Sequence, residues 1–194
     1  MVAVGLSAVA LTSFAAFNRF QLFALRNQAT QIELQGTART VLDLIAREIR
    51  RAGMDPTCTK SFEGIASATF TSIQIKQDLD GSGGIGGTNE DITYRYNYST
   101  QAFERVAGGQ AETLLSDVGL DGSGITYFDS DGAQLGSSSS ALTTAQRAAV
   151  RRVRVQFALA GANFDSEISN PLRAQVSTDI DLRNRFFLNS TVCP

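Results

Sequence analysis

The sequence has no histidine and no tryptophan, and it has only two cysteines among 194 residues. Histidine is the commonest general base and a frequent metal ligand, so its absence removes the usual partner of a serine or cysteine nucleophile. No catalytic triad of the common kind can be assembled from the residues that remain. We therefore predict that the protein is not an enzyme.

The two cysteines stand far apart, at Cys58 and at Cys193, the penultimate residue. This placement predicts a disulfide that ties the end of the N-terminal segment to the C-terminus, in an oxidising compartment. Closing so long a loop contributes about 4–5 kcal/mol in the chain-entropy model. The alternative is two unbonded thiols, which the spacing alone does not exclude.

The net charge of −2 hides an asymmetry along the chain. Residues 1–53 carry six arginines and three acidic residues, a net charge of +3, so the rest of the chain carries −5. A dedicated nucleic-acid binder needs clustered cations, which a mildly acidic domain does not supply. The length after residue 53 suits one domain.

Proline is absent before Pro56, and the first 53 residues read as one helix. A helix of that length is about 80 Å long, more than a head of the remaining size can cover. The sequence therefore predicts two parts, an N-terminal membrane and assembly helix at 1–53 and a globular head at 54–194.

The run up to Phe17 is uncharged and mostly apolar. It is slightly shorter than the roughly 20 residues that cross a bilayer, and a cleaved signal peptide is the alternative. Helical periodicity continues past the run, which favours a membrane-embedded helix. Large apolar side chains then occur on all sides, a pattern that suits lipid or neighbouring helices. The predicted assembly residues are Leu11, Phe14, Phe17, Leu22 and Leu25.

Periodicity predicts how the helix meets the head. A narrow apolar stripe on the second half of the helix is expected to form core, and it comprises Ala38, Val41, Leu42, Ile45, Ile49 and Ala52. Alternation with a period of two predicts strands at 69–76, 92–98, 125–128, 153–159 and 176–182. A short turn after the second of them predicts a hairpin into Phe103–Val106. A short helix is predicted at Leu142–Val150, capped by Thr143 or Thr144. Each strand has one apolar face, so we expect an α+β fold in which the long helix covers one side of an antiparallel sheet.

One loop has the residues of a calcium site. Asp78 and Asp80 precede Gly81, as in the opening of a calcium loop, and Glu90 follows at nearly the position of the closing ligand. The alternative is a solvated hairpin loop in which Asp and Gly serve turn geometry. Calcium at Asp78, Asp80 and Glu90 is the only cofactor that the sequence suggests.

Two further patterns are weaker. The glycines of 81–87 lack the Gly-Lys-Ser/Thr of a phosphate-binding loop. Arg147, Arg151, Arg152 and Arg154 form a basic cluster that would suit DNA or an acidic neighbour, although a solvated strand face is the commoner explanation.

Two segments resemble a known family. The helix ends in the sequence LIAREIRRAG (residues 44–53), and the last predicted strand lies in the sequence VSTDIDLRN (176–184). The residues of the first segment that carry the motif are Arg47, Glu48, Ile49, Arg50, Ala52 and Gly53. With the long apolar-to-amphipathic helix, the two segments resemble the type IV pilin superfamily, and within it the PilW-type minor pilins. The superfamily's Gly-Phe-Thr-Leu-x-Glu signature is missing, but Met1–Val4 resembles its continuation, so we expect the chain to begin inside the mature helix of the family.

The resemblance implies a pilin-like fold and a minor pilin that primes pilus assembly near the fibre tip. The implied partners are other major and minor pilins, the assembly machinery and the inner membrane, with the head in the periplasm before assembly and on the fibre afterwards. The alternatives are a type II secretion pseudopilin of the GspJ kind and an adhesive or DNA-binding tip head.

Overall fold

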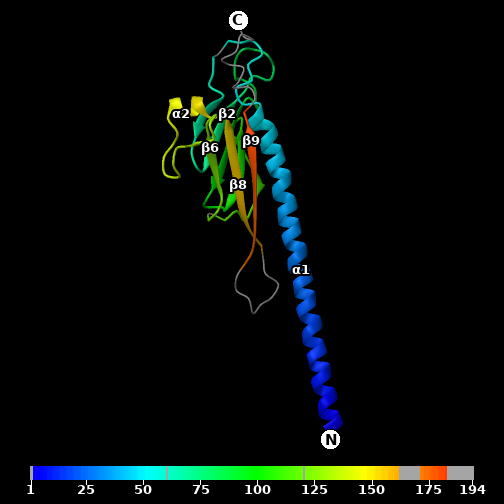
Figure 1. The fold of residues 1–194 in the computed structure, drawn as a ribbon. Coiled ribbons are helices and arrows are strands. Elements are labelled where there is room, and N and C mark those ends of the chain that lie inside the picture. The colour runs from blue at the N-terminus through cyan, green and yellow to red at the C-terminus, as the bar shows by residue number, and fades with distance from the viewer. Residues whose placement is uncertain (1, 60, 120, 162–170, 183–194) are drawn as a thin grey trace.

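The computed structural model describes residues 2–59, 61–119, 121–161 and 171–182; within 2–9 it describes the helical backbone and the exposure of Ala3 and Gly5 alone. Helix α1 (Val2–Arg50) runs for 49 residues without a break. Its second half lies against the head, and its first half extends beyond the head (Figure 1). The predicted long helix is therefore confirmed, and its length is about 70 Å at 1.5 Å per residue.

The end of α1 is defined by backbone geometry. Gly53 has a φ of 78°, and its amide donates to the carbonyl oxygen of Lys76 at 2.8 Å. Gly64 crosses so close that a Cβ there would lie 2.7 Å from the Cα of Gly53. The two glycines thus allow the helix end to turn tightly into the head.

The head contains nine strands and one short helix in the described residues. They are β1 (Ile65–Ala68), β2 (Ser72–Lys76), β3 (Asp91–Asn97), β4 (Ala102–Ala107), β5 (Gln110–Leu115), β6 (Gly124–Phe128), β7 (Gln134–Leu135), α2 (Thr144–Ala149), β8 (Arg152–Gly161) and β9 (Leu172–Asp181). The predicted short helix is confirmed, and Thr143 is its cap, in a capping box with Gln146.

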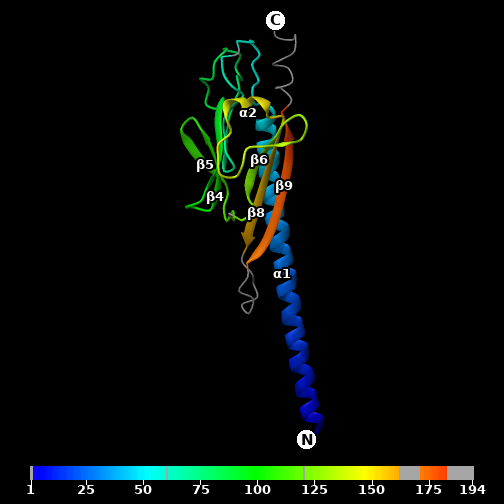
Figure 2. The same ribbon diagram turned by 60° about the vertical axis from the view of Figure 1, so that its left-hand side comes forward.

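The strands form two antiparallel sheets, whereas the sequence predicted one. Strands β1 to β5 form a meander in chain order, and the second sheet has the order β7-β6-β8-β9. Figures 1 and 2 show β6, β8 and β9 of the second sheet side by side. Alternation shows which side chains share a face, but it does not show which strands pair, so the division into two sheets was missed. The predicted α+β class is correct.

One predicted strand, 69–76, begins three residues later than expected, since β2 starts at Ser72. Residues 69–71 belong to the turn between β1 and β2, where the Thr69 hydroxyl oxygen accepts the amide of Ser72 at 2.9 Å. Strand β1 was missed because its sequence, Ile-Ala-Ser-Ala, has little apolar alternation. Strand β5 was missed because its first four residues are all exposed.

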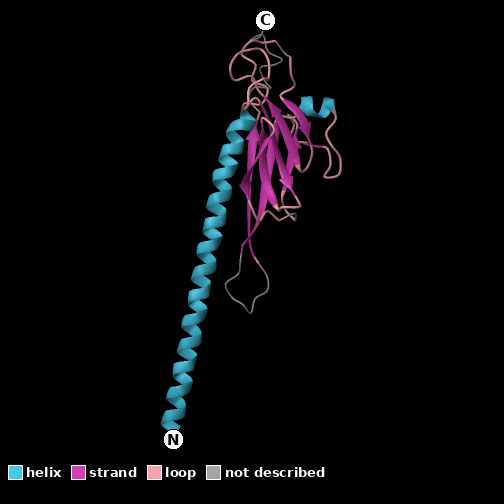
Figure 3. Cartoon of the chain, turned by 180° about the vertical axis from the view of Figure 1, so that it is seen from behind, coloured by secondary structure: helices cyan, strands magenta, loops and turns pink. Residues whose placement is uncertain are grey.

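The core lies where α1 and the two sheets meet (Figure 3). All six residues of the predicted stripe are buried, five on α1 and Ala52 just after it. Helix α1 packs mainly on β8 and β9. Phe103 of β4 meets Phe157 of β8 edge to face at 4.8 Å between ring centres, which joins the two sheets. The Tyr96 hydroxyl also crosses between the sheets and donates to the carbonyl oxygen of Gln156 at 2.7 Å.

Candidate functional site: the assembly surface

The first half of α1 carries large apolar side chains that its own head does not cover. Leu11, Phe14, Phe17, Leu22 and Leu25 are each between 56 % and 69 % exposed. Phe20 and Ile32 are exposed to the same degree. The ribbon views show no described element of the head beside this part of the helix (Figures 1 and 3). All five predicted assembly residues are therefore on an uncovered surface.

The exposed side chains surround the helix. At about 100° per residue, Leu11, Leu22 and Leu25 project to the side opposite the buried stripe of the second half. Phe17 and Phe20 project to the side of the helix that, in the second half, faces the head. A partner that covers them must therefore contact the helix from more than one direction, as several neighbouring helices would.

Among the described residues, no helix combines the length and the apolar character that a membrane crossing needs. The predicted transmembrane helix is therefore not confirmed.

A polar contact fixes the second half of α1 to the five-stranded sheet. The Glu48 carboxylate accepts two hydrogen bonds from the Arg105 guanidinium, at 3.0 and 3.1 Å, and a short one from the Tyr94 hydroxyl. Burial, and then the neighbouring Glu48, raise the pKa of Tyr94. Desolvation opposes the charge of Arg105, but its hydrogen bonds to Glu48 hold its pKa above the ordinary value. The sequence showed Glu48 only as part of a motif, because its partners are more than forty residues away.

The loop between β2 and β3 brings together the three predicted calcium ligands. Asp78, Asp80 and Glu90 each place one carboxylate oxygen within 4.8 Å of the others. Asp78 and Glu90 are buried, whereas Asp80 is exposed. A hydrogen bond from Ser82 lowers the pKa of the Asp80 carboxyl. The cluster has the donor type that calcium prefers.

Backbone amides already use the two buried carboxylates. Asp78 accepts the amides of Gly81 at 2.7 Å, Ser82 at 3.2 Å and Gly83 at 2.9 Å. Glu90 accepts the amides of residues 79, 80 and 87, at 2.9, 3.3 and 2.6 Å. These bonds alone account for the burial of both side chains, so the calcium site stays a prediction.

Two arginines of the predicted basic cluster are held in ion pairs. Arg147 contacts Glu63 at 2.9 Å, and Arg154 forms a two-fold contact with Asp179 at 2.6 and 2.9 Å. Arg152 lies over the ring of Phe128, 4.8 Å from its centre. The two ion pairs reduce the positive charge that the cluster offers to DNA.

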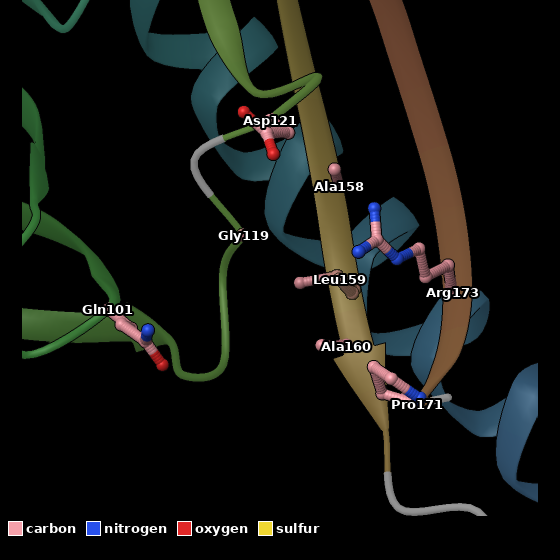
Figure 4. A pocket seen from close by; sticks show the side chains of 8 residues that line it. All are labelled: Gln101, Gly119, Asp121, Ala158, Leu159, Ala160, Pro171 and Arg173. Atoms are coloured by element: carbon pink, nitrogen blue, oxygen red, sulfur yellow. The ribbon is translucent and has the colours of Figure 1, made fainter. Parts of the chain in front are cut away.

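Two hollows lie at the end of the head that faces the protruding part of α1. One, of about 230 Å³, lies between the loop before β6 and the strands β8 and β9, and is lined by Gln101, Gly119, Asp121, Ala158, Leu159, Ala160, Pro171 and Arg173 (Figure 4). The other, of about 360 Å³, lies between α1 and the end of β5. Leu159 lines both.

The predicted disulfide falls partly outside the described residues. Cys58 is described, with a φ of 57°, but Cys193 is not. The pairing of Cys58 with Cys193 therefore stays a prediction.

A long N-terminal helix, half packed on antiparallel sheets and half uncovered, defines a pilin-like protein. The sequence agrees with this class. Residues 27–186 match the family described as prepilin peptidase-dependent protein B, and the chain belongs to that family. The family is related to the type IV pilins and is structural in character. No curated protein and no solved structure matches the chain.

Proposed function

We propose that this protein is a PilW-type minor pilin that takes part in the assembly and priming of a type IV pilus near the fibre tip. The observation that carries the proposal is the uncovered half of α1, with its ring of exposed large apolar side chains. Fully burying one such side chain contributes about 1.5–3 kcal/mol, so the helix gains stability when other helices cover it.

The finer assignment is supported by the end of the helix. The motif that resembles PilW-type pilins includes Glu48, and the structure gives this residue a role, since it holds the helix to the sheet through Arg105 and Tyr94. In this proposal other major and minor pilins cover the helix in the fibre. Before assembly the helix is held at the inner membrane, with the head in the periplasm.

The first prediction tests the helix as an assembly surface. The double substitution Leu22→Ser/Leu25→Ser removes two exposed apolar side chains that no described head residue covers, so the stability of the head should not change. In cells that carry the variant in place of the wild type, we expect the number of surface pili to fall severalfold, counted by electron microscopy.

The matched control is Gln21→Ser/Gln28→Ser, which changes two exposed polar residues of the same segment and should leave piliation normal. Normal piliation with the leucine variant would contradict the proposal. A loss of protein secretion with unchanged pilus number would instead favour the type II secretion pseudopilin. DNA binding by the head has less support, because Arg147 and Arg154 are already paired.

A further inference from the structure

We propose that the hollow between α1 and the end of β5 receives the Arg19–Arg26 segment of a second copy of this chain. The inference rests on the proposed assembly function and adds to it a specific receiving surface on the head. The hollow has a volume of about 360 Å³, near the lower end of the range for binding pockets, about 300–1,000 Å³.

The hollow has an apolar floor and an acidic rim. Leu34 of α1, Leu114 of β5 and Leu159 of β8 line it. Glu33 and Asp117 line it as well, and both are exposed. Within the described part of the chain, neither carboxylate has an ion pair or a hydrogen bond. A neighbouring surface with an apolar centre and two cations would complement it.

Backbone contacts hold the rim in place. Asp117 has a φ of 56°, a conformation that aspartate tolerates better than most residues, and its carbonyl oxygen accepts the amide of Ala160 at 3.0 Å. Val118 forms a β-bridge with Leu159. The loop after β5 is thus tied to β8, so the hollow exists before any partner arrives.

The protruding helix carries the matching pattern. Arg19 and Arg26 are seven residues apart, so they lie on one face about 10 Å apart along the axis. Phe23 lies between them, and the Arg19 guanidinium is 5.4 Å from the centre of its ring. Both arginines are exposed, and among the described residues neither forms an ion pair. In this arrangement the two arginines can face the acidic rim of the hollow, and Phe23 can face its leucine floor.

The same chain cannot bring these surfaces together, because the segment and the hollow belong to one straight helix (Figure 1). Thr30, Glu33 and Thr37, which line the hollow, continue the face of Arg19 and Arg26 toward the C-terminus. A second copy that is shifted along the helix axis brings its own segment to the level of the hollow. Burial of Phe23 would supply affinity, and the charges would set the orientation and register.

A charge exchange tests this contact in the full chain. The pocket variant is Glu33→Arg/Asp117→Asn. Asparagine is chosen at position 117 because, like aspartate, it tolerates the positive φ of that residue. The helix variant is Arg19→Glu/Arg26→Glu. In detergent solution, sedimentation velocity should show that each variant alone self-associates about tenfold or more weakly than the wild type.

Mixing the two variants should restore association, because the acidic helix of one then faces the basic pocket of the other. The control Asp43→Arg/Asp131→Asn makes the same charge change at exposed positions that do not line the hollow, and it should associate like the wild type. Circular dichroism and melting curves confirm that all variants are folded.

Three results would overturn the inference: a wild-type chain that stays monomeric, a pocket variant that associates like the wild type, or a mixture that associates no better than the single variants. These results are distinguishable from failure of the proposed function. If Leu22→Ser/Leu25→Ser reduces piliation while the pocket variant does not reduce association, the assembly helix stands and only the receiving surface is wrong.

Discussion

Glu48 lies near the end of α1 and accepts hydrogen bonds from Tyr94 on β3 and Arg105 on β4. The side chains of Glu48 and Arg105 are mostly buried, at 19 % and 14 % exposure. Arg105 also donates to the side-chain oxygen of Asn89 at 3.0 Å. One carboxylate thus connects the helix to two strands and, through Arg105, to the loop before β3.

We predict that Glu48→Gln lowers the free energy of unfolding by about 1–3 kcal/mol, because Arg105 then lacks its charged partner in a place with little water. Urea denaturation measures the change. Asp43→Asn, at an exposed position of the same helix, is the control and should have little effect. A double-mutant cycle with Arg105→Met should show that the two substitutions are not additive; additive effects would contradict a direct coupling.

At the scale of elements, the loop from 77 to 90 is organised by its own carboxylates. Asp78 and Glu90 together accept six backbone amides, so the loop has a defined shape without regular secondary structure. The positive φ values of Gly81 and Gly83, 73° and 79°, allow the amides to point at Asp78. Of these six amides, the Asp80 carboxylate accepts that of Ser82, at 2.9 Å, which Asp78 accepts as well.

Because the Asp80 side chain is not needed for the loop's own hydrogen bonds, a substitution there can test calcium binding without unfolding the loop. The calcium hypothesis predicts that added calcium raises the melting temperature of the wild type, and that Asp80→Ala abolishes the rise while the loop keeps its shape. Differential scanning calorimetry with and without calcium makes the comparison. Asp131→Ala, in another exposed turn, should keep the rise. If calcium does not change the melting temperature of the wild type, the calcium hypothesis is wrong and the loop is a purely structural element.

For the whole molecule, the two halves of α1 have different environments. The second half completes the core of the head, and the first half contributes no buried hydrophobic residue in the described part of the chain. The stability of the head therefore depends on the second half of the helix, whereas the first half is free to serve the proposed assembly function.

We predict that a chain beginning at residue 27 keeps the melting temperature of the full-length protein within a few degrees, since the core stripe begins at Ala38. The same truncation should be monomeric in sedimentation experiments, because it lacks Leu11 to Arg26. A large fall in melting temperature would show that the protruding half stabilises the head. Oligomers of the truncated chain would place the main association surface on the head instead.

Much of this architecture follows from local patterns in the sequence. The long helix, its buried stripe and the Thr143 cap depend on spacing and on neighbouring residues, and all were predicted. The exposed positions Leu11, Phe14 and Leu25 were also predicted, since a helix with apolar side chains on every side exceeds what one small head can bury. Two sheets were not predicted, because the pairing of β6 with β8 involves residues about thirty positions apart.

The candidate sites also differ in whether local patterns or long-range contacts determine them. The sequence by itself determined that a long apolar-to-amphipathic helix precedes a β-rich head, because periodicity and the absence of proline act over a few turns. Only the tertiary structure decided that Glu48 meets Arg105 and that Glu33 and Asp117 border one hollow. Those contacts join residues far apart in the chain, and the packing of helix on sheet brings them within reach.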